Sequence, residues 1–134
     1  MIGFAFTWHG HACVELETPG GRTVVFDPWF GNPKSTKAAD HVDRCDVLLV
    51  THGHDDHFGD ALTIGARLRP AWPCVHEMSL WLARRLPGGA DAVIGMNKGG
   101  SVDVAGLRIT MVHADHSAGA WNADAGVPLH LGEP

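Results

Sequence analysis

Three histidines and two aspartates fall within the segment His52-Gly53-His54-Asp55-Asp56-His57. Neutral imidazole and carboxylate groups are the usual protein ligands of zinc and similar divalent ions. Residues two apart point the same way in an extended chain, so His52 and His54 can bind one ion together. Asp56 and His57 follow a bend and point elsewhere, so they can serve a second ion. The segment therefore predicts a metal site, with a spacing different from that of helical i, i+4 zinc motifs.

The elements that position this segment are strands. Apolar, alternating or β-branched runs predict strands over residues 2–8, 13–18, 23–26 and 46–51. The turn Pro19-Gly20-Gly21 makes a hairpin of the second and third strands. The fourth strand is continuously apolar, which is typical of a strand covered on both faces, and the metal segment follows it directly as a polar loop. A long loop is expected over residues 29–44, and loops of that length are uncommon unless functional.

The second part of the chain mixes both element types. Helices are predicted over residues 60–69, with Asp60 as the cap and Pro70 as the stop, and over residues 78–86. Short strands are expected at residues 73–76 and 92–94, and a second hairpin over residues 102–113. We expect no clear element after residue 113. Strands outnumber helices and the two interleave, which predicts a layered α/β (α+β) fold.

Composition narrows the function classes. The chain has 134 residues, the size of one small domain, and its 45% hydrophobic residues suffice for a core. A formal net charge of −5 argues against a general binder of nucleic-acid backbones. We find neither a long apolar stretch nor a secretion signal, so we expect a cytoplasmic protein without a membrane partner. The three cysteines form no CxxC pair and are expected to be buried free thiols.

The metal segment resembles the HxHxDH signature of the metallo-β-lactamase superfamily. More narrowly, the chain resembles uncharacterised metal-dependent hydrolases related to ascorbate-6-phosphate lactonase. Four further strings carry the resemblance, in the family's order: His9-Gly10-His11-Ala12, Phe26-Asp27-Pro28-Trp29-Phe30 with Asn32-Pro33, Gly95-Met96-Asn97-Lys98-Gly99-Gly100 and Ala114-Asp115-His116-Ser117. The resemblance covers nearly all of the chain. It implies the αββα sandwich of that family, with residues 1–134 as a single domain that is truncated before its second half.

The resemblance also implies a set of ligands. His52, His54 and His116 would hold the first metal ion, and Asp56 and His57 would belong to the second. The family's bridging aspartate and last histidine have no match here. The first ion would therefore keep three protein ligands and an open position, the pattern of a catalytic zinc. The second would keep two ligands and should bind weakly.

Two further residues are expected near the ligands. His11 resembles a family histidine near the active site, which would contact the substrate or support a ligand. Asp27 lies at a strand end, where its carboxylate can accept a hydrogen bond from a ligating imidazole and fix the tautomer of that ring.

The leading hypothesis for function is a metal-dependent hydrolase. A metal-activated water would attack a carbonyl or phosphoryl centre of a small-molecule substrate, and Asp56 would orient that water or help to bind the second ion. Zinc is the expected metal, at up to two ions, and manganese and iron stay open because they accept the same ligands.

Two alternatives remain at this stage. One is a metal-binding fragment without turnover, because the second half of the domain is missing. The other is a nucleic-acid-processing enzyme of the same superfamily, against which the negative charge weighs. An uncovered apolar face of half a sandwich also favours association, so a homo-oligomer is a further expectation.

Overall fold

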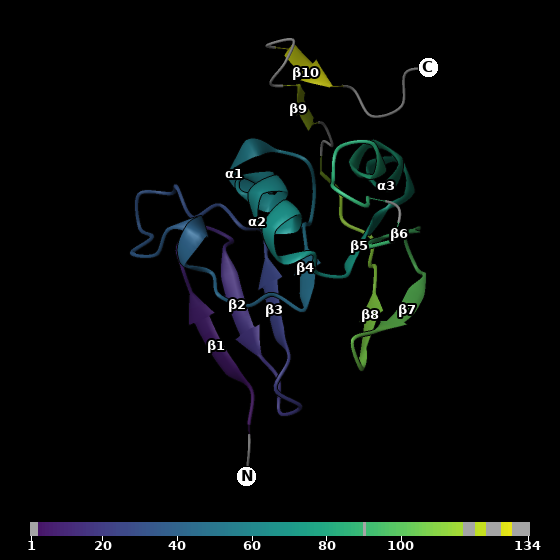
Figure 1. Ribbon diagram of the computed structural model, residues 1–134. Coiled ribbons are helices and arrows are strands. Elements are labelled where there is room, and N and C mark those ends of the chain that lie inside the picture. Colours follow the sequence, from purple (N-terminus) through teal and green to yellow (C-terminus); the bar gives the residue numbers. More distant parts are fainter. Residues whose placement is uncertain (1–2, 90, 117–119, 123–126, 130–134) are drawn as a thin grey trace.

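The computed structural model describes residues 3–89, 91–116, 120–122 and 127–129 (Figure 1). One sheet contains four strands in chain order: β1 (Ala5–Trp8), β2 (Val14–Glu17), β3 (Thr23–Phe26) and β4 (Val47–Leu49). The predicted hairpin is present, since β2 pairs with β3 in antiparallel register, and β4 then joins β3 in parallel. Between β3 and β4 lies the predicted long loop, which contains the short 3-10 helix η1 (Ala39–His41).

Helices and strands then alternate, as predicted. The elements in order are α1 (Asp55–Phe58), α2 (Ala61–Leu68), β5 (Trp72–Val75), α3 (His76–Ala83) and β6 (Val93–Met96). Strands β5 and β6 are parallel, and a bridge between Val47 and Ala71 connects the start of β5 to β4. Figure 1 shows α1 and α2 beside the ends of β3 and β4, and α3 beside β5 and β6.

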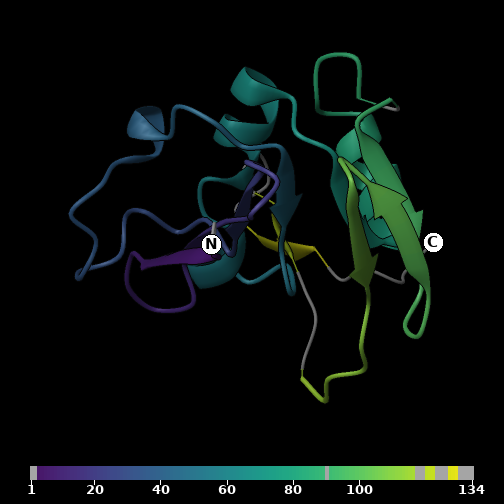
Figure 2. The ribbon, with the colours of Figure 1, turned by 90° about the horizontal axis from the view of Figure 1, so that it is seen from below.

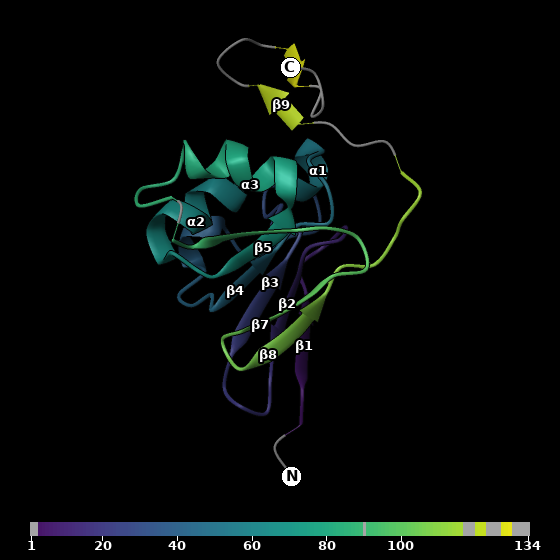
Figure 3. The same ribbon diagram turned by 90° about the vertical axis from the view of Figure 1, so that its right-hand side faces the viewer.

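Two hairpins complete the described part of the chain. The first joins β7 (Ser101–Val104) to β8 (Leu107–Thr110), and the second joins β9 (Ala120–Asn122) to β10 (Val127–Leu129). Seen from below, the β7–β8 hairpin lies on the side of the molecule opposite β1 (Figure 2). The segment that follows β8 swings outward and rises toward the end that carries α1 (Figure 3).

The core lies between the sheet and the helices. Val25 of β3 and Leu48 of β4 are partners in register and are both fully buried. They pack in one cluster with Ile64 of α2, Leu82 of α3 and Trp72 of β5. Burying each aliphatic side chain of this size contributes about 1.5–3 kcal/mol, so this cluster holds the strand ends in place.

The opposite face of the sheet is apolar as well. Cross-strand register aligns Phe6, Leu16, Val24 and Val47 in one row across the four strands. Val24 and Val47 are buried, whereas toward the β1 edge Phe6 is 67% exposed and its neighbours Phe4 and Trp8 are 70% and 55% exposed. This face is therefore covered near β3 and β4 and open at β1.

Several local predictions need correction. Residues 52–59 were expected to be a loop, but α1 forms because the carbonyl of His54 accepts hydrogen bonds from the N–H groups of His57 and Phe58. Asp60 precedes α2 as predicted but does not cap it, since its carboxylate accepts the N–H of Phe30 at 2.9 Å instead. The hairpin of β9 and β10 was not predicted. In the described ranges, no helix combines the length and apolarity that a membrane span needs.

A single carboxylate ties the first hairpin to β4. Asp46 accepts hydrogen bonds from the N–H of Thr23 at 2.8 Å and from the guanidinium groups of Arg44 at 2.7 Å and Arg22 at 3.1 Å. Burial alone would raise the pKa of Asp46, but these hydrogen bonds outweigh it and lower the pKa to about 2. The folded protein therefore favours the charged carboxylate.

Leu48→Ala should lower the free energy of unfolding by about 2–5 kcal/mol, because it leaves a cavity among fully buried side chains. The matched control is Leu80→Ala on α3, where the leucine is 54% exposed and the expected change is below about 0.5 kcal/mol. Urea unfolding followed by circular dichroism measures both. Equal effects of the two substitutions would contradict the assignment of the core.

Asp46→Asn should lower the free energy of unfolding by about 2 kcal/mol at pH 7. The folded pKa of Asp46, about 2, lies below the ordinary value, so its contribution is complete above about pH 4 and is lost as the pH falls toward 2. The difference between wild type and variant should shrink over that window. Urea titrations at several pH values test this, with the exposed Asp103→Asn as the control. A difference that does not change with pH would be evidence against the role of the charge.

Candidate metal centre

The polar residues predicted to bind metal gather where β3 and β4 end. Asp27 directly follows β3, and His52 and His54 follow β4. His57 lies in α1, and His11 lies in the turn between β1 and β2. Because β3 and β4 are parallel, their carboxyl ends meet at the same edge of the sheet.

A first donor group consists of His52, His54 and His116, whose donor atoms all lie within 4.8 Å of one another. The Nε2 atom of His52 is 2.9 Å from the Nδ1 atom of His54. The ring centroid of His116 is 4.5 Å from that of His52 and 5.0 Å from that of His54. His116 reaches the group from the segment after β8, more than sixty residues along the chain from the other two.

Thr51 sets the orientation of the His52 ring. Its hydroxyl oxygen lies 2.8 Å from Oδ2 of Asp27 and 3.0 Å from Nδ1 of His52. A carboxylate can only accept, so the hydroxyl donates to Asp27 and accepts the N–H at Nδ1 of His52. Nε2 of His52 then carries a free lone pair, the form that a metal ligand requires.

The charge state of His52 suits metal binding too. Burial, together with repulsion from the rings of His57 and other nearby histidines, lowers the pKa of His52 to about 4. The imidazole is therefore neutral at pH 7, and a neutral imidazole is what a divalent ion binds.

A second donor group consists of His11, Asp56 and His57. The Nε2 atom of His11 is 3.2 Å from Oδ2 of Asp56 and 3.3 Å from Nε2 of His57. Nδ1 of His57 points the other way and donates to Oδ2 of Asp27 at 2.8 Å. The two groups adjoin, since the ring centroids of His52 and His57 are 4.2 Å apart.

Asp27 is linked to both donor groups by hydrogen bonds, directly to His57 and through Thr51 to His52. It is 2% exposed and accepts hydrogen bonds from the backbone N–H of Thr51 at 2.7 Å, from the hydroxyl of Thr51 and from His57. Its backbone has a positive φ of 41°, an unusual conformation for a residue other than glycine. Such strain is retained where the surrounding structure fixes the residue, and here the hydrogen bonds do so.

The loops that carry the second group are tied together by Asn32. Its side-chain amide donates to the carbonyls of His9 at 3.0 Å and of Trp29 at 2.6 Å. Gly10 lies against it with a positive φ of 99°, and a Cβ atom there would fall 2.1 Å from Oδ1 of Asn32. The turn after β1 therefore requires glycine at position 10.

The structure brings together every residue of the predicted ligand set. Asp27 contacts an imidazole of the second group, as expected of it, and His11 lies among the donors of that group itself. Sequence reasoning gave no role to Thr51 or Asn32, whose side chains contact a ligand or join the loops that carry ligands. Position 51 lies between a buried strand and the first histidine, which is a usable signal for Thr51. The signal for Asn32 is its place in a string that resembles the family. The three cysteines are buried and free, and burial raises the pKa of each thiol to about 12.

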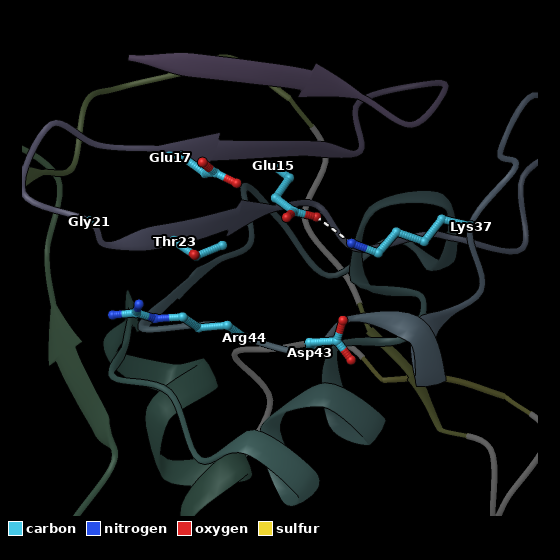
Figure 4. Close-up of a pocket in the computed structure, with 7 residues that line it drawn as sticks. All are labelled: Glu15, Glu17, Gly21, Thr23, Lys37, Asp43 and Arg44. Carbon is cyan, nitrogen blue, oxygen red and sulfur yellow. Dashed lines mark hydrogen bonds and ion pairs between the residues drawn. The ribbon is translucent and has the colours of Figure 1, made fainter. Parts of the chain in front are cut away.

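A separate polar hollow of about 380 Å³ lies between β2, β3 and the long loop, and Figure 4 shows its lining. The ion pair between Glu15 and Lys37, at 2.7 Å, crosses it. The residues that line this hollow include none of the two donor groups. The hollow is therefore separate from the candidate metal centre.

Comparison with solved structures finds a protein of the same fold. Igni18, described as a novel metallo hydrolase from the hyperthermophilic archaeon Ignicoccus hospitalis, superimposes with a TM-score of 0.75 at 34% identity. The match covers 92% of this chain and 52% of Igni18.

Comparison of sequences gives relatives with a consistent name. A UPF0173 metal-dependent hydrolase of Koribacter versatilis is 42% identical over 125 residues, which are 92% of this chain and 52% of that protein. A UPF0173 metal-dependent hydrolase of Methanopyrus kandleri is 43% identical over 113 residues, which are 84% of this chain and 47% of that protein. The chain thus spans about half the length of the curated relatives it matches.

A family model for the β-lactamase superfamily domain matches residues 5–127. The match includes both donor groups and the strands that carry them. On this match, with the fold and the relatives that accompany it, the chain belongs to the β-lactamase superfamily.

Proposed function

We propose that this chain is the metal-binding part of a hydrolase that cleaves a carbonyl or phosphoryl bond of a small molecule. The observation that carries the proposal is the convergence of His116 on His52 and His54 from a distant segment. The relatives' printed name, metal-dependent hydrolase, supports the same reaction class.

The donor chemistry fits a divalent ion, with zinc as the proposed metal. Three neutral imidazoles with an open position are a common ligand set of catalytic zinc. When bound, such an ion supplies Lewis acidity and lowers the pKa of a coordinated water to about 7, which provides a nucleophile at neutral pH.

The chain's own residues have four roles in this proposal. His52, His54 and His116 hold the ion, and the Thr51–Asp27 pair keeps the His52 ring in the ligating tautomer. The carboxylate of Asp56 is 48% exposed, so it can orient the attacking water or help to bind a second ion. Trp29 contacts the His11 ring edge-on at 5.5 Å and gives the site an apolar border, while Phe30 is buried in the core.

A second candidate function is metal binding without turnover. It is favoured by one observation, that the chain spans about half of each relative described above. The two candidates agree on metal binding and differ in hydrolysis, so two separate measurements distinguish them.

His54→Ala should remove one bound equivalent of zinc, because it removes one of three imidazoles from the first group. His41→Ala is the matched control, since His41 is 73% exposed on η1 and belongs to neither group. Isothermal titration calorimetry and elemental analysis of the purified chain measure the stoichiometry. A zinc content that His54→Ala leaves unchanged would end the proposal.

The zinc-loaded chain should hydrolyse at least one member of a panel of lactones and phosphodiesters. His54→Ala should slow that hydrolysis by about 100-fold or more, because Lewis-acid stabilisation contributes several kcal/mol and about 1.4 kcal/mol is tenfold in rate. His41→Ala should hydrolyse at the wild-type rate. Binding of zinc with no hydrolysis above the His54→Ala level would favour the second candidate.

A further inference from the structure

We propose that His11 is the third protein ligand of the second ion, so that this chain alone supplies three ligands to each of two ions. The inference rests on the metal binding of the proposed function and goes beyond it. The ligand pattern deduced from the sequence gave the second ion two ligands, Asp56 and His57. The tertiary structure adds a third donor from the turn between β1 and β2.

The distances between donor atoms fit one tetrahedral ion. The three separations are 3.2 Å between His11 Nε2 and Asp56 Oδ2, 3.3 Å between His11 Nε2 and His57 Nε2, and 4.0 Å between His57 Nε2 and Asp56 Oδ2. Ligands of a tetrahedral zinc ion with bonds of about 2.0–2.1 Å lie about 3.3–3.4 Å apart. Two of the three edges therefore match, and a small rotation of the half-exposed Asp56 side chain shortens the third.

The orientation of His57 leaves its inner nitrogen available. A buried carboxylate, Asp27, accepts the N–H at Nδ1 of His57, so Nε2 carries a lone pair. Nε2 of His11 faces that lone pair at 3.3 Å. An ion pair between His11 and Asp56 would need only those two side chains. A cation bound by all three groups would also need Nε2 of His57 at this point, where it lies.

The backbone of the turn is held in a conformation that directs His11 inward. His11 has a positive φ of 50°, which costs a residue other than glycine about 1–3 kcal/mol. The indole N–H of Trp8 donates to the carbonyl of His11 at 2.8 Å, and the edge-on contact with Trp29 fixes the ring. In this conformation the imidazole of His11 lies within 3.2–3.3 Å of Asp56 and His57.

The test is a crossed measurement of zinc stoichiometry. Wild type should bind two equivalents in calorimetric titration. His11→Ala should keep the equivalent at the first group and weaken the other by about 100-fold or more, because loss of a ligand exceeds the 10–100-fold cost of losing a residue that supports one. His54→Ala should show the opposite loss, and His41→Ala should bind as wild type does.

A variant that restores a donor separates ligation from a structural role. Aspartate tolerates positive φ and offers a carboxylate, so His11→Asp should recover the second equivalent that His11→Ala loses. In the presence of a chelator, the melting temperatures of His11→Ala and wild type should agree within a few degrees. Added zinc should then raise the melting temperature of wild type and of His11→Asp more than that of His11→Ala.

The outcomes are distinct for the two proposals. Two equivalents bound equally tightly by wild type and His11→Ala would overturn the role of His11, and so would a single equivalent in wild type. Should His11→Ala fail to fold, His11→Asp decides by the same stoichiometry, with one equivalent counting against the inference. Two equivalents that depend on His11, without hydrolysis of any substrate, would sustain the inference and reject the proposed hydrolase.

Discussion

The candidate metal centre depends on one buried carboxylate. Asp27 accepts hydrogen bonds from the backbone and hydroxyl of Thr51 and from the ring of His57. Through these contacts it fixes the start of the metal segment, the tautomer of His57 and, by way of the Thr51 hydroxyl, the tautomer of His52. A buried carboxylate must have its acceptor capacity satisfied, and here the groups that satisfy it are those that carry the ligands. The same requirement therefore stabilises the fold and orients the donors.

The scaffold makes this arrangement possible through the parallel pairing of β3 and β4. Their carboxyl ends lie at one edge of the sheet, so the residues after each strand become neighbours although 24 positions separate Asp27 from Thr51. Packing of Val25 and Leu48 against α2 and α3 keeps those ends rigid. Left-handed conformations at His11 and Asp27 are tolerated beside this rigid edge, where hydrogen bonds from neighbouring elements hold them.

Both donor groups lie within a chain that spans about half the length of the relatives described above. The sheet that carries them is covered by helices on one face, and on the other it exposes Phe4, Phe6 and Trp8 near the β1 edge. The ligand positions are thus assembled by the segments that follow β1, β3 and β4, by α1 and by the segment after β8. Of the exposed side chains near β1, Trp8 takes part in this assembly, because its indole N–H donates to the carbonyl of His11.

The sequence by itself determined the local pattern. The spacing of apolar and polar residues, together with turn residues such as Gly and Pro, predicted the hairpin of β2 and β3, the buried strand β4 and helices α2 and α3. These signals act between residues that are close along the chain. The sequence also singled out His52, His54, Asp56 and His57, which lie in one short segment. The resemblance to a known family added His116, Asp27 and His11 as candidates near them. The one-turn helix α1 escaped notice, since four residues carry no periodicity.

Tertiary structure decided which distant groups meet. The contact of Thr51 with Asp27, the tie that Asn32 makes between two loops and the entry of His11 among the donors all join residues from separate elements. Asp60 illustrates the same limit, because its position favoured a helix cap but a nearby N–H from Phe30 was the better donor. Such pairings depend on how the strands and loops pack in three dimensions. His11 and His57 are 46 positions apart, so their contact does not affect the spacing of apolar and polar residues from which elements are predicted.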